Sequence, residues 1–420
     1  MKLQFHNQWE IIKSTESYSK ISATDWQQWP WQMRLSAQKK EDFEKWVSLS
    51  PQEKLFFENR NQNHFNVRAT PYYLSLIDSS DEFDPIRRIA IPQVSEQQQA
   101  QDFSELDPLG ERKNNPVERI IHRYSDRVLF LITDICSVYC RYCTRKHFTG
   151  QEQFLASQKD YQTALNYIRQ QKGIREVILS GGDPLTLSDE VLAGILKDLR
   201  QIEHVEIIRI GSRMPVVNPM RVTTSLVQVL KKYKPVYLMT HFNHPKELSA
   251  EAAAGLELLV DNGVPVFNQM VLLNGVNNHP AIIQGLSRRL LFLRVKPYYM
   301  FQCDPSFGSD HLRTSIDESL AIQKELWGHL SGLAMPTLSI DIPSGGGKMT
   351  YAPNFEHQIS TDFRKFTGFD GVQATYHNPL KDYSRLPSNL EMYLEEWEEL
   401  KKAKFMPLGL SDKTEIGFEL

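Results

Sequence analysis

The sequence predicts an α/β protein built on a partial (β/α)6 barrel, and three observations support this fold class. Six short apolar runs follow one another between Arg127 and Asp304, each with the length of a buried parallel strand. A helix-length segment lies between successive runs, which implies a parallel sheet with helices outside it. Polar residues follow each run directly, where parallel α/β folds place their sites.

The first 120 residues precede this pattern and are mostly polar and helical. The segment SPQEKLFFENR begins with a capping box, because Glu53 follows Ser50 by three residues. The stretch from Asp84 to Pro116 is rich in Pro, Gln, Asp and Asn, so we expect a long irregular connection there. We therefore assign residues 1–120 to an N-terminal, mostly helical region with a linker.

The predicted barrel occupies residues 121–350. Pro235 and Pro265 stand at the starts of two of its strands, a position where proline is tolerated. Six units are too few to close a standard eightfold barrel, so we expect an open, partial one. The strands are predicted in RVLFLITDI, IREVILSGGD, VEIIRIGSR, PVYLMTHF, PVFNQMVLL and KPYYMFQCD.

Residues able to do chemistry gather at the ends of these six runs. The carboxyl ends of parallel strands meet at one edge, so we expect a single site there. The first run leads into three cysteines, and the later ones end in Ser180 to Asp183, Ser212 and Arg213, His241 to His244, Asn268 and Gln269, and Gln302 to Asp304.

Beyond Gly332, the segment MPTLSIDIPSGGGKMTYAPN predicts one further strand and a glycine loop that ends the barrel region. Residues 351–420 form a C-terminal extension. Its tail, LEMYLEEWEELKKAKF, predicts an amphipathic helix.

The composition narrows the class of function. The net charge of −3 supports neither nucleic-acid binding nor binding to a membrane surface. The first ten residues lack the apolar core of a signal peptide, and no apolar run approaches the ~18 residues of a membrane span. We expect a cytoplasmic protein with no nucleic-acid or membrane partner. The chain has four cysteines, three of them adjacent, which is not a disulfide framework.

The three adjacent cysteines form the pattern C-x-x-x-C-x-x-C in TDICSVYCRYCTRKHF, at Cys136, Cys140 and Cys143. Three buried thiols in a loop, or a zinc site completed by another ligand, are two explanations. A four-iron cluster is the interpretation we favour, because three thiolates hold three irons and leave the fourth open. That iron can bind the amine and carboxylate of S-adenosylmethionine, whose cleavage gives a 5′-deoxyadenosyl radical.

The glycine loop SGGGKM ends in Lys348. It is not a phosphate-binding loop of the Walker type, because Ser344 stands at the first glycine position and Met349 follows the lysine. An exposed loop lysine is the simplest interpretation. The alternative is a lysine that forms a Schiff base with an aldehyde cofactor such as pyridoxal phosphate.

These motifs resemble two nested families. CSVYCRYC after the first strand and LSGGDP after the second resemble the radical S-adenosylmethionine superfamily. Over nearly its whole length the chain is similar to the lysine 2,3-aminomutase family. The matching stretches are TPYYLSLID, HRYSDRVLFLITDICSVYCRYCTR, LSGGDP, THFNHPKE, KPYYMFQCD and DIPSGGGK.

The resemblance implies three cofactors and a role for each site residue. Cys136, Cys140 and Cys143 would hold a 4Fe-4S cluster, and Lys348 would carry pyridoxal 5′-phosphate. Arginine suits phosphate because its planar fork donates two hydrogen bonds at once. The phosphate and ring would be held by Arg123, Tyr124 and Arg127, and S-adenosyl-L-methionine by Ser180, Gly181, Gly182, Asp183, His241 and Gln269.

The same resemblance implies a small-molecule amino acid substrate. Arg145 would bind its carboxylate, and Asp304 and Asp341 would face its distal amine. The implied reaction is that of an isomerase, which converts L-lysine to L-β-lysine with an external electron donor. Arginine would also suit two carboxylates, whereas glutamate would need a cation there. A lysine on a protein is a further alternative, and a non-catalytic iron–sulfur protein is one of another class.

Three departures from the family pattern stand out. Phe301 replaces a frequent tyrosine, and Tyr142 stands where a histidine is common between the second and third cluster cysteines. Many members bind zinc between subunits through C-terminal cysteines, but this chain has no cysteine after Cys303. We therefore expect a homo-oligomer without the family's intersubunit zinc.

Overall fold

The computed structural model describes residues 5–15, 18, 21–60, 65–97, 105–150, 157–379 and 390–402. A nine-stranded sheet in the linear order β1 to β9 forms its centre. Strands β2 to β8 are parallel, whereas β1 and β9 pair antiparallel at the two edges. The strands are β1 Ile120–Tyr124, β2 Arg127–Thr133, β3 Glu176–Gly181, β4 Ile207–Gly211, β5 Val236–Thr240, β6 Val266–Leu272, β7 Lys296–Gln302, β8 Thr337–Ile342 and β9 Gly347–Thr350.

The predicted fold class is confirmed. All six predicted runs are strands, β2 to β7, and each pairs parallel with its neighbour. The further strand predicted before the glycine loop is β8, a seventh parallel strand. The glycine loop then turns the chain back into β9, which pairs with β8. Because a strand and not a helix follows this loop, the geometry agrees with the rejection of a Walker-type loop.

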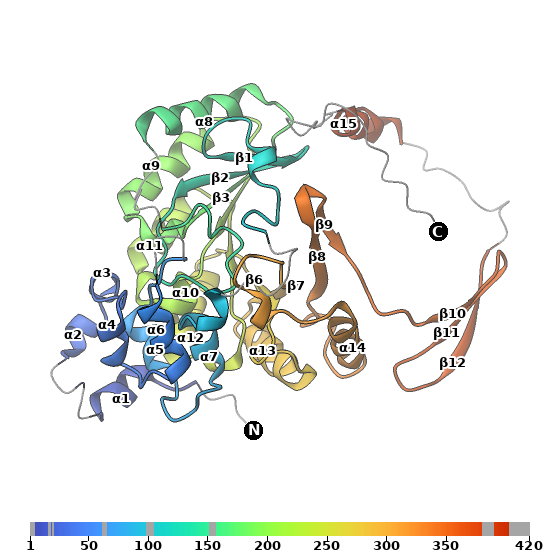
Figure 1. Cartoon of the computed structure of the whole chain (residues 1–420). Coiled ribbons are helices and arrows are strands. Elements are labelled where there is room, and N and C mark those ends of the chain that lie inside the picture. The colour runs from blue at the N-terminus through green and yellow to red at the C-terminus, as the bar shows by residue number, and fades with distance from the viewer. Residues whose placement is uncertain are drawn as a thin grey trace.

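Helices cover the outer side of the sheet (Figure 1). Five of the six long ones begin at a Ser or Thr whose side chain accepts a backbone N–H of the first turn, and α13 uses His279 in the same way. Their apolar stripes face the strands, as in α9, which buries Leu192, Ile195, Leu196 and Leu199. They are α8 Gln158–Gln170, α9 Asp189–Arg200, α11 Thr224–Lys232, α12 Ala250–Asp261, α13 Pro280–Phe292 and α14 Ile316–Leu326.

Short helical turns follow the strand ends, and all except η8, which leads into β9, connect a strand to one of these helices. They are η4 Pro184–Thr186, α10 Met214–Val217, η5 Pro219–Arg221, η6 Pro245–Glu247, η7 Asp310–Leu312 and η8 Pro343–Gly345. Each starts with or soon contains a proline except η7, and proline suits the first turn because its missing N–H has no partner there. These turns fix the residues that follow the strands.

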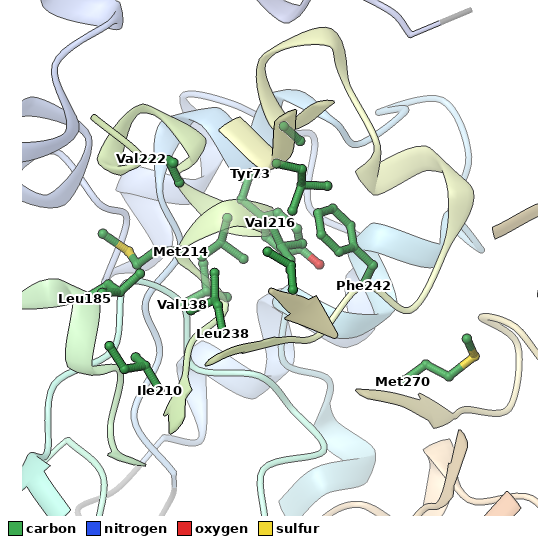
Figure 2. Close-up of a cluster of buried hydrophobic side chains, with 14 of the residues drawn as sticks. Tyr73, Val138, Leu185, Ile210, Met214, Val216, Val222, Leu238, Phe242 and Met270 are labelled. Carbon is green, nitrogen blue, oxygen red and sulfur yellow. The ribbon is translucent and has the colours of Figure 1, made fainter. Parts of the chain in front are cut away.

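The apolar core runs without a break from the barrel into the N-terminal region. Figure 2 shows Ile210 and Leu238 of the barrel near Met214 and Val216 of α10, with Tyr73 of the N-terminal region beside them. Val138, from the loop that carries the cysteines, is buried in the same cluster. The cysteine loop therefore packs against both the barrel and the N-terminal helices.

The N-terminal region consists of short helices, as predicted. The capping box at Ser50 and Glu53 is present at the start of α5. The irregular connection predicted from Asp84 to Pro116 is wrong in part, because Asp84 caps a helix, α7, that buries Ile86 and Ile89. The elements are α1 Gln8–Lys13, α2 Ala23–Trp26, α3 Trp29–Arg34, α4 Lys40–Glu44, α5 Pro51–Glu58, α6 Pro71–Ser75, α7 Pro85–Ala90, η2 Val94–Gln97 and η3 Arg112–Asn114.

The C-terminal extension contains a small antiparallel sheet that the sequence did not predict. It is formed by β10 Glu356–Ile359, β11 Phe363–Thr367 and β12 Gln373–His377. All five residues of β12 are exposed, and Figure 1 shows the sheet projecting away from the barrel. The predicted tail helix is α15 Glu391–Lys402, although the last residues of its predicted segment lie outside the described ones.

The proposed divisions after residues 120 and 350 stay predictions. Among the described residues, no helix combines the length and the apolar character that crossing a membrane requires.

Candidate active site

A cavity of about 740 Å³ opens at the carboxyl ends of the parallel strands. The volume is ample for a small ligand and at least one cofactor. The residues to which the sequence analysis gave a cofactor or substrate role all line this one cavity: Arg123, Tyr124, Arg127, Cys136, Cys140, Cys143, Arg145, Ser180, Gly181, Gly182, Asp183, His241, Gln269, Asp304, Asp341 and Lys348. Among the other strand-end residues, Ser212 and Arg213 also line it, whereas Asn243, His244, Asn268, Gln302 and Cys303 do not. The expected convergence at one edge of the sheet is therefore present.

The cysteine loop, residues 134–150, has no regular secondary structure and is fixed by contacts with the N-terminal region. The backbone N–H of Tyr139 donates to the carbonyl of Arg68, and that of Arg141 donates to the carbonyl of Ile89. The Arg141 side chain forms a fully buried ion pair with Glu96 at 2.6 Å. Removing one partner of a buried ion pair is strongly destabilising, because the other charge is left buried without a partner. The pair therefore holds the cysteine loop against the N-terminal region.

The three thiols are partly buried at one side of the cavity. Burial raises the pKa of the Cys136 and Cys143 thiols, and the neighbouring thiols raise it further. A metal would displace those protons on binding. No three His, Cys, Asp or Glu side chains converge on one ion site in the part of the chain that the structure describes. A cluster with each thiolate on a different iron does not need such convergence. The donor set therefore fits a four-iron cluster.

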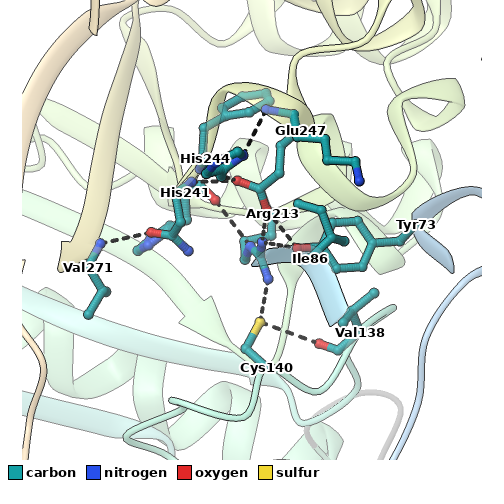
Figure 3. Close-up of polar contacts among 12 residues, drawn as sticks. Tyr73, Ile86, Val138, Cys140, Arg213, His241, His244, Glu247 and Val271 are labelled. Atoms are coloured by element: carbon teal, nitrogen blue, oxygen red, sulfur yellow. Dashed lines mark hydrogen bonds and ion pairs between the residues drawn. The ribbon is translucent and has the colours of Figure 1, made fainter. Parts of the chain in front are cut away.

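A buried cation lies against the thiol of Cys140 (Figure 3). Arg213 Nη1 donates to Cys140 Sγ at 2.6 Å, and Arg213 Nη2 contacts Glu247 Oε1 at 2.7 Å. The hydroxyl of Tyr73 donates to the same carboxylate at 2.6 Å. The sequence analysis noted Arg213 as a strand-end residue but missed this network, because Tyr73 and Glu247 stand far from it in the chain.

The glycines after β3 are required by packing of the chain on itself. A Cβ on Gly181 would lie 2.1 Å from the carbonyl oxygen of Thr133, and one on Gly182 would lie 2.3 Å from that of Ile135. The N–H groups of Gly182 and Asp183 donate to these same two carbonyls. The glycines thus seat the cysteine loop on β3. Packing alone thus requires glycine at both positions, and their contact with S-adenosylmethionine stays a prediction.

The Asp183 side chain also makes hydrogen bonds within the protein. Its Oδ1 accepts from the N–H of Leu185 and its Oδ2 from that of Arg213, at 3.0 and 2.8 Å. Both oxygens thus hold the turns after β3 and β4. A contact of this residue with a cofactor stays a prediction.

The opposite side of the cavity is formed by the glycine loop and by the β1–β2 hairpin. The N–H of Lys348 donates to the hydroxyl of Tyr124 at 2.9 Å, and Arg123 Nε donates to the carbonyl of Gly345. Gly345 and Gly347 both have φ of +88°, which other residues rarely adopt. This backbone turns the Lys348 side chain back toward β7 and β8.

Lys348 meets a carboxylate and an aromatic ring. Its Nζ lies 2.7 Å from Asp341 Oδ2 and 3.8 Å from the centre of the Phe301 ring. The Phe301 departure therefore removes a hydroxyl but keeps a ring face that attracts the ammonium. The residues present fit pyridoxal phosphate, since an amine faces the cavity and two arginines, Arg123 and Arg127, stand beside it.

Two further groups have unusual proton affinities. Burial, and then the neighbouring Asp341 carboxylate, raise the pKa of Asp304 to about 7. Burial, and then the cations Arg213, Arg145 and Lys348, lower the pKa of His241 to about 3. His241 is therefore neutral at physiological pH, whereas Asp304 is close to its midpoint.

Tyr142, the other departure, is buried beside the cysteine loop. Its hydroxyl accepts a hydrogen bond from Asn243 Nδ2 at 2.7 Å, and its ring lies 5.9 Å from the guanidinium of Arg213. It is thus part of the cavity wall beside the thiols.

Fold and site together define the class. A parallel β/α barrel with three cysteines after its first parallel strand, facing a cavity at the strand ends, is the arrangement of a radical S-adenosylmethionine enzyme. The model of the radical SAM superfamily matches residues 130–282, and that named lysine-2,3-aminomutase matches residues 323–416. The class implies a 4Fe-4S cluster and S-adenosylmethionine as cofactors.

Full-length relatives identify the family. The chain is 45% identical to L-lysine 2,3-aminomutase of Clostridium subterminale over 88% of each chain. It is 39% identical to that of Bacillus subtilis, over 98% of this chain and 86% of the relative. Glutamate 2,3-aminomutase of Clostridioides difficile is 40% identical, over 86% and 85%. The chain belongs to the lysine 2,3-aminomutase family, and it is an isomerase of the aminomutase type.

Proposed function

We propose that this protein is a pyridoxal-phosphate-dependent radical aminomutase that converts L-lysine to L-β-lysine. The observation that carries the proposal is the composition of the cavity. Three thiols line one side and a lysine amine lines the other, and Arg145, Asp304 and Asp341 also line the cavity. An amino acid with a carboxylate, an α-amine and a distal cation has a complementary partner for each group.

On the thiol side, Cys136, Cys140 and Cys143 would hold the cluster. With S-adenosylmethionine bound, the cluster supplies a 5′-deoxyadenosyl radical when an external donor provides an electron. His241 and Gln269 would contact the adenosyl ligand. A neutral His241 can donate or accept one hydrogen bond there without adding a further charge.

On the lysine side, Lys348 would hold pyridoxal phosphate, with Arg123, Tyr124 and Arg127 on its phosphate and ring. The cofactor supplies the conjugated system through which an amino group migrates to the neighbouring carbon. In the structure Lys348 pairs with Asp341. With the lysine amine bound to the cofactor this ion pair would be lost, and Asp341 would be open to the ammonium of an arriving substrate.

The substrate would lie between Arg145 and the two aspartates. Arg145 would bind the carboxylate, and Asp304 with Asp341 would bind the distal ammonium. Glutamate would bring a second carboxylate to those aspartates, which like-charge repulsion opposes. Arginine would bring a guanidinium that suits them, so it is the stronger rival, although a glutamate enzyme is among the relatives.

The test is to reconstitute the protein anaerobically with iron, sulfide and pyridoxal phosphate, and to incubate it with S-adenosylmethionine, dithionite and each of the twenty amino acids in turn. Chiral chromatography with mass detection would then identify β-isomers. We expect L-β-lysine with the highest kcat/KM. More efficient turnover of arginine would overturn the substrate assignment, and no β-isomer from any amino acid would overturn the proposed reaction.

A further inference from the structure

Arg145 has a carboxylate partner that neither the motif analysis nor the proposed reaction uses. Glu111 contacts it along one edge of the guanidinium. Arg145 Nε lies 2.9 Å from both carboxylate oxygens of Glu111, and Nη2 lies 2.8 Å from Oε1. On its other side, Nη1 donates to Ser180 Oγ at 3.1 Å. Both Glu111 and Arg145 line the cavity.

The geometry of these contacts leaves one edge of Arg145 available. A guanidinium carries one hydrogen on Nε and two on each Nη. Glu111 accepts the hydrogen on Nε and forms an ion pair with Nη2, and Ser180 accepts one hydrogen from Nη1. Within the described residues, the hydrogen of Nη2 that points away from Glu111 has no hydrogen-bond partner. It lies on the end-on edge, which Nη2 shares with Nη1 and through which a guanidinium can bind a second carboxylate with two parallel hydrogen bonds.

Glu111 is itself fixed in a tight turn. Its N–H donates to Asp107 Oδ1 at 2.9 Å, and the next N–H, that of Arg112, donates to Oδ2 of the same side chain. Only 5% of Glu111 is exposed. The same turn packs on the glycine loop, since a Cβ on Gly345 would lie 3.2 Å from Asn114 Nδ2. The carboxylate is therefore held by a rigid segment that touches both sides of the cavity.

We propose that Glu111 is the positioning residue of the substrate-carboxylate site. It holds Arg145 along the Nε edge, so that the end-on edge is ready for the carboxylate of an amino acid. This inference rests on the proposed function of Arg145. An arginine whose orientation is fixed in advance loses less conformational freedom when the substrate binds, which strengthens binding.

The charge of Glu111 acts in the opposite direction, because a nearby anion repels a substrate carboxylate. Orientation outweighs this repulsion, since Glu111 and the substrate use different hydrogens of Arg145. Without an anionic partner the guanidinium can also turn toward other carboxylates of the cavity, such as Asp304 and Asp341.

The test compares two ligands in the wild-type protein and in Glu111→Gln. L-Lysine carries the carboxylate, and 1,5-diaminopentane lacks it but keeps both amines. Calorimetry on protein loaded with its cluster and pyridoxal phosphate, without S-adenosylmethionine, measures binding without turnover. Glu111→Gln should weaken lysine binding by about 10- to 100-fold, the range that one charge-assisted hydrogen bond spans. Binding of 1,5-diaminopentane should change by less than about twofold.

Two further variants separate positioning from folding. Glu111→Asp keeps the charge, so it should bind lysine more tightly than Glu111→Gln does. In turnover assays, both variants should change KM for lysine more than kcat, relative to the wild type. Glu53→Gln breaks another buried Glu–Arg pair, with Arg87, outside the cavity and should leave both affinities unchanged.

Unchanged or tighter lysine binding in Glu111→Gln would overturn the inference, and so would an equal loss for both ligands. If the wild-type protein isomerises a different amino acid, the substrate proposal fails but this inference does not. The same comparison is then made with that amino acid and its decarboxylated amine.

Discussion

The two sides of the cavity are built in different ways. The thiol side comes from one short loop in which Cys136 and Cys143 are separated by only six residues. The lysine side brings together the β1–β2 hairpin, the end of β7, β8 and the glycine loop, which span residues 120–350. A compact motif thus faces an assembly of distant segments, and the proposed reaction requires that both act on one molecule.

The difference concerns what each side depends on. The cysteine loop is seated by backbone contacts with β3 and by the buried Arg141–Glu96 pair, so it can hold its ligands whether or not Lys348 is present. The lysine side depends on interactions between neighbouring charged groups. Asp341 pairs with Lys348, and after burial it is the next cause of the raised pKa of Asp304. Substitutions on the two sides should therefore be separable.

The largest expected effect is on the thiol side. Cys140→Ala should abolish reductive cleavage of S-adenosylmethionine, because a cluster with only two thiolates loses the third of its protein-held irons. Release of 5′-deoxyadenosine under dithionite measures this. Borohydride should still fix pyridoxal phosphate to Lys348 in the variant. Cys303→Ala, a change at the buried cysteine outside the motif, is the control and should retain cleavage. Full cleavage in Cys140→Ala would refute the cluster assignment.

On the lysine side, Asp341→Ala should lower kcat/KM for lysine by roughly two to four orders of magnitude, since it would remove one of the two carboxylates proposed to enclose the substrate ammonium. Iron content and labelling of Lys348 should stay as in the wild type. Asp261→Ala breaks an exposed pair with Arg294 and should have little effect. A loss below about tenfold in Asp341→Ala would mean that another group binds the ammonium.

A smaller effect is expected for the cofactor phosphate. Arg123→Ala should raise the dissociation constant for pyridoxal phosphate about 10- to 100-fold, because a charge-assisted hydrogen bond is lost. Equilibrium dialysis measures it. Arg175→Ala, at a surface pair with Glu206, is the matched control. Equal retention in both variants would remove Arg123 from the phosphate site.

The smallest effect concerns pH. Asp304, with its pKa raised to about 7 by burial and then by Asp341, is neutral at lower pH and charged above it. The lysine side chain stays protonated throughout this range. KM for lysine should therefore rise by up to about tenfold for each pH unit below 7 and be level above it. Asp304→Asn should flatten the profile, and an unchanged profile in that variant would assign the dependence to another group.

Much of the fold followed from local patterns. Buried parallel strands need continuous apolar runs, so all six were predicted, as was the capping box at Ser50. The three-stranded sheet β10 to β12 was not predicted, because its strands are largely exposed and have no apolar face that signals a core. Helix α7 was missed because Asp84 and Pro85, which start it, are equally typical of a loop.

The position of the site was predictable from the rule for strand ends, and Cys140 and Lys348 do line the same cavity. Their roles were implied by the family resemblance and stay predictions. Glu111 and Glu247 could not be found, because each acts through an arginine that only folding brings near. The structural role of Gly181 was also hidden, since sequence alone does not reveal which backbone fills the space beside it.

The central claim is that the radical made on the thiol side reaches the amino acid held on the lysine side. The direct measurement uses L-lysine deuterated at its β-carbon, incubated with the reconstituted protein, a reductant and unlabelled S-adenosylmethionine. Mass spectrometry of the recovered 5′-deoxyadenosyl group then follows the label. We predict deuterium in that group together with deuterated β-lysine. Formation of 5′-deoxyadenosine without any deuterium, while β-lysine accumulates, would contradict the account.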